Sequence, residues 1–422
     1  MATRYFNWKL ATVLMMAIGI FGVAAYALHR WQVGARAVQA LPLGEDAYAQ
    51  QDYDEAAIQL GKYIAVNMED AEVLCKYADA QLKRRPMTAS NVQQAVTAYR
   101  SVLRLDGRNT EAARRLIEVY LWPSMRAPGE AELIARRYLE TSDNIDIRRM
   151  LADALWQQRK PAEAAAVLTA LLEKHPEEVA SYERLGMLAE QFGAVLKTPP
   201  AQWFDDAVAK NPQLALAYVA RAGFYLRQKD RGKALADLTQ AQQCDLSNTE
   251  ARLRLVGALE NAGLLDQARE HLQALEAKDA TAPLLWQYWA DLARRANATE
   301  EMAAVAERGL QALAAQPWDF MPMATELLIR AGRLEAAADC IARMRQRDIA
   351  PRETAFLEGL LADQRGQLRE AVTAWRKAIT LGYRLPVVHR MLASALSRLG
   401  DTQSAIGQLR TLVTEAPDNL EG

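Results

Sequence analysis

Residues 354–383 read TAFLEGLLADQRGQLREAVTAWRKAITLGY, and this stretch predicts two short helices joined by a turn at Gly366. Gly359 in the first helix and Ala371 in the second are small, so we expect the two helices to cross closely. Trp375 is expected to fill the space beside the crossing. One hairpin of this size cannot bury its own apolar face, and it therefore needs neighbours of the same kind.

The same pattern recurs along most of the chain. Residues equivalent to Gly359, which we call anchors, follow one another at intervals of 34 to 39 residues. The anchors are Gly44, Ala78, Ile117, Ala152, Gly186, Ala222, Val256, Ala290, Ala324, Gly359 and Ala393. In most copies the residue twelve positions later is also small, namely Ala56, Ala164, Ala234, Ala268, Ala336, Ala371 and Ala405. With abundant helix formers and few β-branched runs, this predicts an all-α chain of about eleven stacked hairpins over residues 41–417.

Some copies depart from the pattern. Insertions fall at residues 83–91, 122–129 and 195–200, and Met302 replaces the second small residue of the eighth copy. We expect these copies to keep their helices and to join them through longer loops, which serve as contact sites or are tolerated as extra length. After the first insertion, Thr88 or Ser90 is expected to cap the returning helix.

The N-terminus contains an uncharged stretch, LATVLMMAIGIFGVAAYAL, at residues 10–28. As a helix it would span about 28 Å, close to the hydrocarbon thickness of a bilayer. Basic and aromatic residues flank both ends, which favours an uncleaved transmembrane anchor between an N-terminal tail (1–9) and a juxtamembrane linker (29–40). The sequence Ala25-Tyr26-Ala27 supports the alternative, a cleaved signal peptide.

The sequence leaves two questions without a single answer: the orientation of the anchor in the membrane, and what covers the last hairpin. Flanking positive charges are nearly equal, and the short basic tail favours an N-terminus in the cytoplasm with the repeats outside it. After Pro417 only residues 418–422 follow, so the last hairpin has no further helix to cover it. The chain is then truncated, or another protein or copy covers this face, or the last helix is amphipathic enough alone.

The repeat resembles the tetratricopeptide repeat, which has two small residues, then a large residue and often a proline at fixed spacing. The matching residues are Ala152, Ala164, Leu168 and Pro176 in one copy and Ala393, Ala405, Leu409 and Pro417 in another. The resemblance covers residues 41–417 and implies a right-handed α-solenoid that binds protein or peptide partners in a concave groove. With the predicted anchor, the chain also resembles membrane-anchored bacterial proteins of this family.

The composition and motifs exclude several classes of function. Lys plus Arg total 51 against 52 for Asp plus Glu, so nothing favours a nucleic-acid partner. The three cysteines are far apart and the four histidines form no metal-binding spacing. We find no catalytic motif. We therefore predict no enzyme activity and no catalytic, cofactor or metal site.

One cluster of apolar residues is expected to face the groove. The repeat register places Trp318, Met321, Leu328, Phe356 and Leu360 on the exposed side of the first helices of the ninth and tenth copies. An exposed apolar patch often marks a partner site, so these residues are candidates for peptide binding. Two alternatives are that neighbouring repeats bury these side chains, and that the register is displaced by one residue.

These observations predict a scaffold or adaptor that acts through protein–protein contacts. We expect a single-pass protein of a bacterial inner membrane whose repeats lie outside the cytoplasm, with a cytoplasmic position as the alternative. Two other functions fit the sequence: the non-catalytic arm of a larger enzyme or secretion machine, and a cleaved soluble periplasmic factor. The partner and the oligomeric state do not follow from the sequence.

Overall fold

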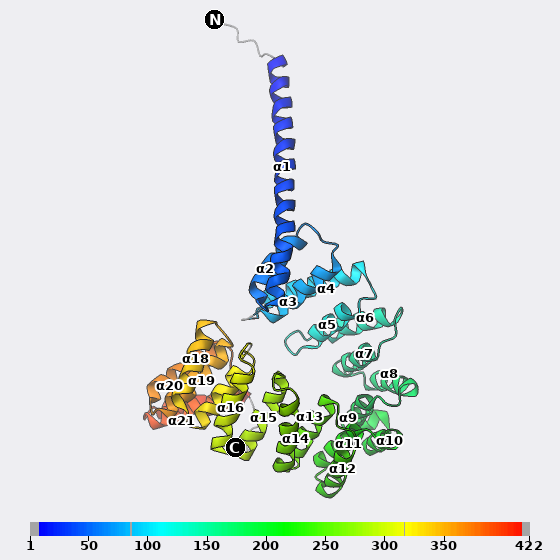
Figure 1. Ribbon diagram of the computed structural model, residues 1–422, viewed down its shortest axis with the longest axis vertical. Coiled ribbons are helices and arrows are strands. Elements are labelled where there is room, and N and C mark those ends of the chain that lie inside the picture. Colours follow the sequence, from blue (N-terminus) through cyan, green and yellow to red (C-terminus); the bar gives the residue numbers. More distant parts are fainter. Residues whose placement is uncertain (1–7, 85–86, 316, 416–422) are drawn as a thin grey trace. The chain divides into compact units, whose positions relative to one another are not determined.

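The computed structural model describes residues 8–84, 87–315 and 317–415, which form twenty-two α-helices and no strand (Figure 1). The chain divides into two compact units, Met1–Val167 and Leu168–Gly422. Within each unit, consecutive helices pair as antiparallel hairpins. The described residues therefore form an all-α repeat protein.

The first unit contains three complete hairpins, which are followed by one more helix and the start of the next. Its helices are α1 (Trp8–Ala49), α2 (Tyr53–Ile64), α3 (Ala71–Lys83), α4 (Ala89–Leu105), α5 (Thr110–Leu121), α6 (Pro128–Leu139), α7 (Ile145–Gln157) and α8 (Pro161–Lys174), of which α8 continues past the unit boundary. Thr88 caps α4: its Oγ1 accepts a hydrogen bond from the Asn91 N–H at 3.2 Å. The Asn91 side chain accepts one from the Thr88 N–H in return, which is a capping box.

The second unit contains the remaining hairpins. Their helices are α9 (Val179–Leu196), α10 (Pro200–Lys210), α11 (Ala215–Arg227), α12 (Arg231–Gln243), α13 (Thr249–Asn261), α14 (Leu265–Lys278), α15 (Pro283–Ala296), α16 (Thr299–Ala312), α17 (Met321–Arg330), α18 (Leu334–Gln346), α19 (Pro351–Gln364), α20 (Leu368–Thr380), α21 (Pro386–Arg398) and α22 (Thr402–Glu415). The odd-numbered first helices contact one another along the stack, from α9 to α19. Together with α21 they form what we call the first-helix face of this unit.

The two helices of each hairpin meet at the anchor. All eleven anchors are buried, and so are the small partners on the second helices except Ala336. At Gly359 the approach is very close, because a Cβ atom there would lie within 3.0 Å of the Trp375 ring. Gly186 meets Phe204 and Gly44 meets Leu60 in the same way. A large side chain on the second helix thus occupies the space that a small anchor leaves free.

The turn between the two helices also repeats. Seven residues after the anchor, the backbone has a positive φ at Gln51, Arg159, Lys229, Gly263, Asn297, Gly366 and Gly400. At all of these turns except Asn297, the N–H of the next residue donates to the carbonyl five positions earlier, as from Gln367 to Ala362 at 2.8 Å. This is the Schellman arrangement that ends a helix and satisfies its last carbonyls.

The ninth hairpin shows that the predicted register is displaced there by one residue. Its left-handed turn residue is Gly332, which lies seven positions after Thr325 and not after Ala324. Thr325 is fully buried, and the buried alanine of α18 is Ala337, whereas the predicted Ala336 is exposed. The anchor of this copy is therefore Thr325. Sequence comparison chose Ala324 because alanine is the commoner small residue at this position.

Helix α1 extends well beyond its hairpin with α2 (Figure 1). Residues 29–40, predicted as a linker, are part of this continuous helix. Among the side chains that the structure describes, no helix is long and apolar enough to cross a bilayer. Most side chains of the predicted anchor, residues 10–28, lie outside the described residues, and the anchor stays a prediction.

The crossing at Gly359 gives a direct test of the packing. Gly359→Ala should lower the free energy of unfolding by roughly 1–3 kcal/mol, because the new methyl group must displace the Trp375 ring from a tight core. Gly407→Ala in α22 is the matched control, since a Cβ atom there meets open space. The control should be neutral or stabilising by up to about 1 kcal/mol, because alanine favours helix more than glycine does. Urea unfolding followed by circular dichroism measures both, and equal effects would contradict the packing.

Candidate functional site

The predicted apolar groove is not an open surface. Met321 and Leu328 are 0% and 1% exposed, so the expectation that they face solvent is wrong. The displaced register of the ninth hairpin is the reason, because it turns Glu326 and Arg330 toward the first-helix face instead. Glu326 lies 3.5 Å from Arg294 on α15 and 2.8 Å from Arg330.

The other three predicted groove residues are also largely covered. Phe356 is buried, and its ring centroid lies 5.2 Å from that of Tyr383. Leu360 is half-buried against the core. Trp318 is half-buried, and the Arg347 guanidinium lies 4.4 Å from its ring centroid. These side chains pack within the repeats, and peptide binding by them stays a prediction.

The first-helix face of the second unit carries ion pairs where apolar residues were expected. An acidic residue four positions after one anchor repeatedly pairs with an arginine five positions after the next. The pairs are Glu190–Arg227 at 2.9 Å, Glu260–Arg295 at 3.6 Å and Asp363–Arg398 at 2.7 Å. Glu183 and Arg254 pair at 2.5 Å across two repeats. Since these charges are matched within the chain, this face offers little unpaired charge to a ligand.

Glu260 is the exception on this face, because it is buried and poorly satisfied. Its side chain is 4% exposed, and its Oε1 has no hydrogen-bond partner among the described residues. Desolvation raises the pKa of the Glu260 carboxyl to about 7; Arg295 opposes this shift and Asp291 adds to it. A carboxyl in this setting is protonated in the folded protein at a pH where it would ionise in the unfolded chain.

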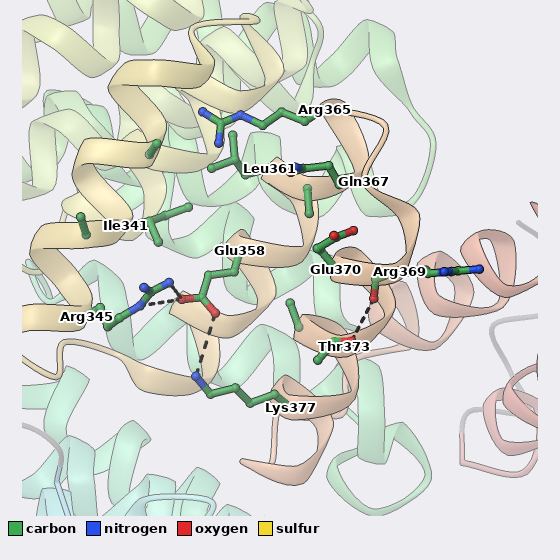
Figure 2. A pocket seen from close by; sticks show the side chains of 14 residues that line it. Ile341, Arg345, Glu358, Leu361, Arg365, Gln367, Arg369, Glu370, Thr373 and Lys377 are labelled. Atoms are coloured by element: carbon green, nitrogen blue, oxygen red, sulfur yellow. Dashed lines mark hydrogen bonds and ion pairs between the residues drawn. The ribbon is translucent and has the colours of Figure 1, made fainter. Parts of the chain in front are cut away.

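A pocket of about 580 Å³ lies on a different part of the second unit, between α18, α19 and α20 (Figure 2). We call it the α18–α20 pocket. Its apolar lining consists of Ile341, Leu361 and four alanines, Ala338, Ala342, Ala362 and Ala374. Because alanine side chains are short, they leave open space between α18 and α20. The pocket therefore resembles the hydrophobic grooves in which amphipathic helices bind.

Charged side chains surround this apolar lining. Figure 2 shows Arg345 and Lys377 both reaching toward Glu358, at 3.0 Å from Nε to Oε1 and 4.0 Å from Nζ to Oε2. At another edge, Arg365 pairs with Glu335 at 2.7 Å. Altogether the pocket is lined by four cations (Arg345, Arg365, Arg369 and Lys377) and two carboxylates (Glu358 and Glu370). With Glu335, which pairs with Arg365 beside the pocket, the carboxylates number three, and the remaining excess of one positive charge favours an acidic ligand.

Sequence reasoning missed this pocket. It considered only the first helices as a binding surface, whereas two of the three helices that form the pocket are second helices. Ala338 and Ala342 on α18 and Ala374 on α20 carried a signal, because these alanines are not the ones that the repeat pattern requires for packing. In the described part of the chain, no group of three His, Cys, Asp or Glu side chains is placed to hold a metal ion.

Comparison with known proteins agrees with the hairpin geometry. Residues 149–215 and 356–419 match the family model described as Tetratricopeptide repeat. These two segments are similar to the tetratricopeptide repeat family, and the first of them spans the boundary between the two units. No curated protein matches the chain significantly.

Several solved structures of repeat proteins are similar to the chain at low identity. Yeast Tom70 is 14% identical, with 97% of this chain and 99% of that chain covered and a TM-score of 0.44. MamA is 16% identical, with 43% and 94% covered and a TM-score of 0.37. YrrB, described as a TPR protein with an unusual peptide-binding site, is 22% identical, with 46% and 95% covered and a TM-score of 0.30.

The buried carboxyl of Glu260 predicts a specific dependence of stability on pH. The group titrates near 4.5 when unfolded and near 7 when folded, so the folded state loses stability as the pH rises through this window. Glu260→Gln removes the titration. Between about pH 5 and about pH 8, its stability relative to the parent should therefore rise by up to roughly 3 kcal/mol.

A second variant separates this effect from simple loss of a contact. Arg295→Met removes the cation that lowers the pKa of Glu260, so the loss of stability should extend to higher pH than in the parent. Urea unfolding at a series of pH values measures all three proteins. Curves that stay parallel for parent and Glu260→Gln would show that Glu260 does not titrate in this range.

Proposed function

We propose that this protein is a scaffold that binds an acidic amphipathic helix of a partner protein in the α18–α20 pocket. The observation that carries the proposal is the combination of an apolar, alanine-lined floor with four cations and two carboxylates around it. Tetratricopeptide repeats generally mediate protein–protein interactions, and the matched residues 356–419 include most of α19 and all of α20. The pocket thus lies in part on a segment similar to that family.

The shape and charge of the pocket explain why an acidic helix fits. An incoming helix can place its apolar side chains on the exposed Ala342 and the partly exposed Ala338 and Ala374, because Ile341 and Leu361 are themselves only 4% and 7% exposed. Acidic residues beside these apolar side chains would meet Lys377, whose Nζ lies 4.0 Å from the Glu358 Oε2 and is therefore weakly paired. They would also meet Arg369, which lines the pocket from the first turn of α20. Such pairs would favour acidic over basic partners and increase the association rate.

Peptide binding to the full chain in detergent tests the proposal. The probes are helical peptides with a Leu/Phe stripe flanked by Asp and Glu, and the same peptides with Lys in place of the acids. The acidic peptides should bind more tightly. Ala342→Trp, which fills the floor, and Lys377→Glu, which reverses a charge, should each weaken binding by about tenfold or more, or about 1.4 kcal/mol.

Two control variants on the same helices make this test specific. Ala336→Trp changes another exposed alanine of α18, and Arg376→Glu reverses the charge next to Lys377 on α20; neither residue lines the pocket. Both should bind like the parent. If the controls and the pocket variants lose binding equally, or if basic peptides bind as well as acidic ones, the pocket is not the site.

We also propose that residues 10–28 anchor the scaffold in a membrane, as part of a bacterial cell envelope. The support is the uncharged apolar stretch and the basic and aromatic residues that flank it. Confinement to a membrane would raise the effective concentration of the scaffold toward other membrane-bound partners. The mass of the mature protein distinguishes this form from a cleaved soluble factor, because cleavage after Ala27 would remove the stretch.

Alkaline extraction of membranes tests the anchor. The parent should stay in the membrane pellet after a carbonate wash. Leu14→Arg combined with Phe21→Arg should release the protein, because each arginine near the centre of a spanning helix costs about 2.5–3.5 kcal/mol of insertion free energy. Release of the parent under the same wash would contradict the anchor, whatever the behaviour of the variant.

A further inference from the structure

The part of α1 that extends beyond its hairpin carries an exposed apolar stripe. Leu28, Trp31 and Val38 are 55%, 70% and 66% exposed, and Ala35 between them is exposed as well. Leu28 ends the proposed anchor and Trp31 flanks it, whereas Ala35 and Val38 lie beyond the anchor and expose apolar surface to water, at a cost of roughly 25 cal/mol per Å². This part of the stripe favours a protein partner.

The spacing of this stripe is that of a coiled-coil seam. Leu28, Trp31, Ala35, Val38 and Pro42 follow one another at alternating intervals of three and four residues, which places them at successive a and d positions of a heptad. A helix that presents such a seam pairs with another helix that presents the same pattern. Over residues 28–42 the seam is about 22 Å long.

The side of α1 opposite the seam is already occupied. Ala37, Ala40, Gly44 and Ala47 are buried, and they lie at the c and f positions of the same heptad. Gly44 is the anchor that meets Leu60 of α2. Because the hairpin packs on c and f, it leaves a and d free, and pairing through the seam requires no rearrangement of the first unit.

The residues that flank the seam favour a second copy of the same chain. The e and g positions are Gln32, Gly34, Gln39 and Leu41, so no like charges would face each other in a symmetric pair. Arg30 and Arg36 lie at c and b, away from the seam. The bulky Trp31 is next to the small Gly34 and Ala35, which leaves room for two tryptophans at one level of a parallel pair.

We propose that residues 28–42 of α1 pair in parallel with the same segment of a second copy of this chain. The seam covers only two heptads, which is short for a coiled coil in solution. The pair therefore rests on the proposed membrane anchor, which would hold both copies side by side in one orientation. The product is a dimer whose two sets of repeats leave the membrane together.

Disulfide cross-linking of the full chain in phospholipid vesicles tests the pairing. In a background with Cys75→Ala, Cys244→Ala and Cys340→Ala, Val38→Cys places a thiol at a d position of the seam. Val33→Cys is the matched control, since Val33 is an exposed valine of α1 at position f. On mild oxidation Val38→Cys should form the linked dimer at least about tenfold faster than Val33→Cys, because only the seam brings the two thiols within disulfide distance.

Maleimide labelling of both thiols first corrects for their accessibility. Adding Trp31→Glu to Val38→Cys should abolish the linked dimer, because it places two carboxylates opposite each other in the seam. Retention of the protein in the vesicles is measured separately. A chain that is not retained would contradict the proposed membrane anchor. If the chain is retained but the disulfide forms equally slowly at both positions, the proposed pairing is wrong. The pairing is also wrong if lipid shields the Val38→Cys thiol from maleimide and no dimer forms.

Discussion

The close crossing of two helices at a small residue is the constraint on which each hairpin depends. At Gly359, Gly186 and Gly44 there is no space for a Cβ atom, because Trp375, Phe204 and Leu60 from the second helix already fill it. The Trp375 N–H also donates to the Phe356 carbonyl at 3.2 Å, which fixes the rotation of one helix against the other. Once the crossing point and the rotation of the two helices are set, they determine which other residues of the hairpin face the core and which face solvent.

Repetition of that crossing determines what the surface of the second unit can offer a partner. Positions four and five residues after the anchors come together along the first-helix face, where acidic residues and arginines neutralise each other from repeat to repeat. The α18–α20 pocket differs, because its alanines leave the floor open and its cations outnumber its carboxylates. The proposed recognition of a partner therefore lies at this pocket, whereas the ion pairs of the first-helix face connect one repeat to the next.

Helix α1 belongs to the repeats on one side only. Ala37, Ala40 and Gly44 pack toward the first hairpin, whereas Trp31 and Val38 on the opposite side have no cover among the described residues. Residues three or four positions apart lie on the same side of a helix, and the hairpin packs against only one side of α1. The opposite side is therefore available for a second contact. The proposed pairing of two copies and the proposed pocket lie in different units, so either can be lost without the other.

The sequence by itself determined the helical class, the hairpin unit and its period, because the small residues and turns that set them lie within about 35 residues of one another. Only the tertiary structure decided the rest. Which of two adjacent small residues, Ala324 or Thr325, sits at the crossing depends on where α17 begins, and that one-residue choice moved Met321 and Leu328 from the surface to the core. The α18–α20 pocket likewise needs side chains from two successive hairpins, and the distance between hairpins is a property of their packing that no local pattern records.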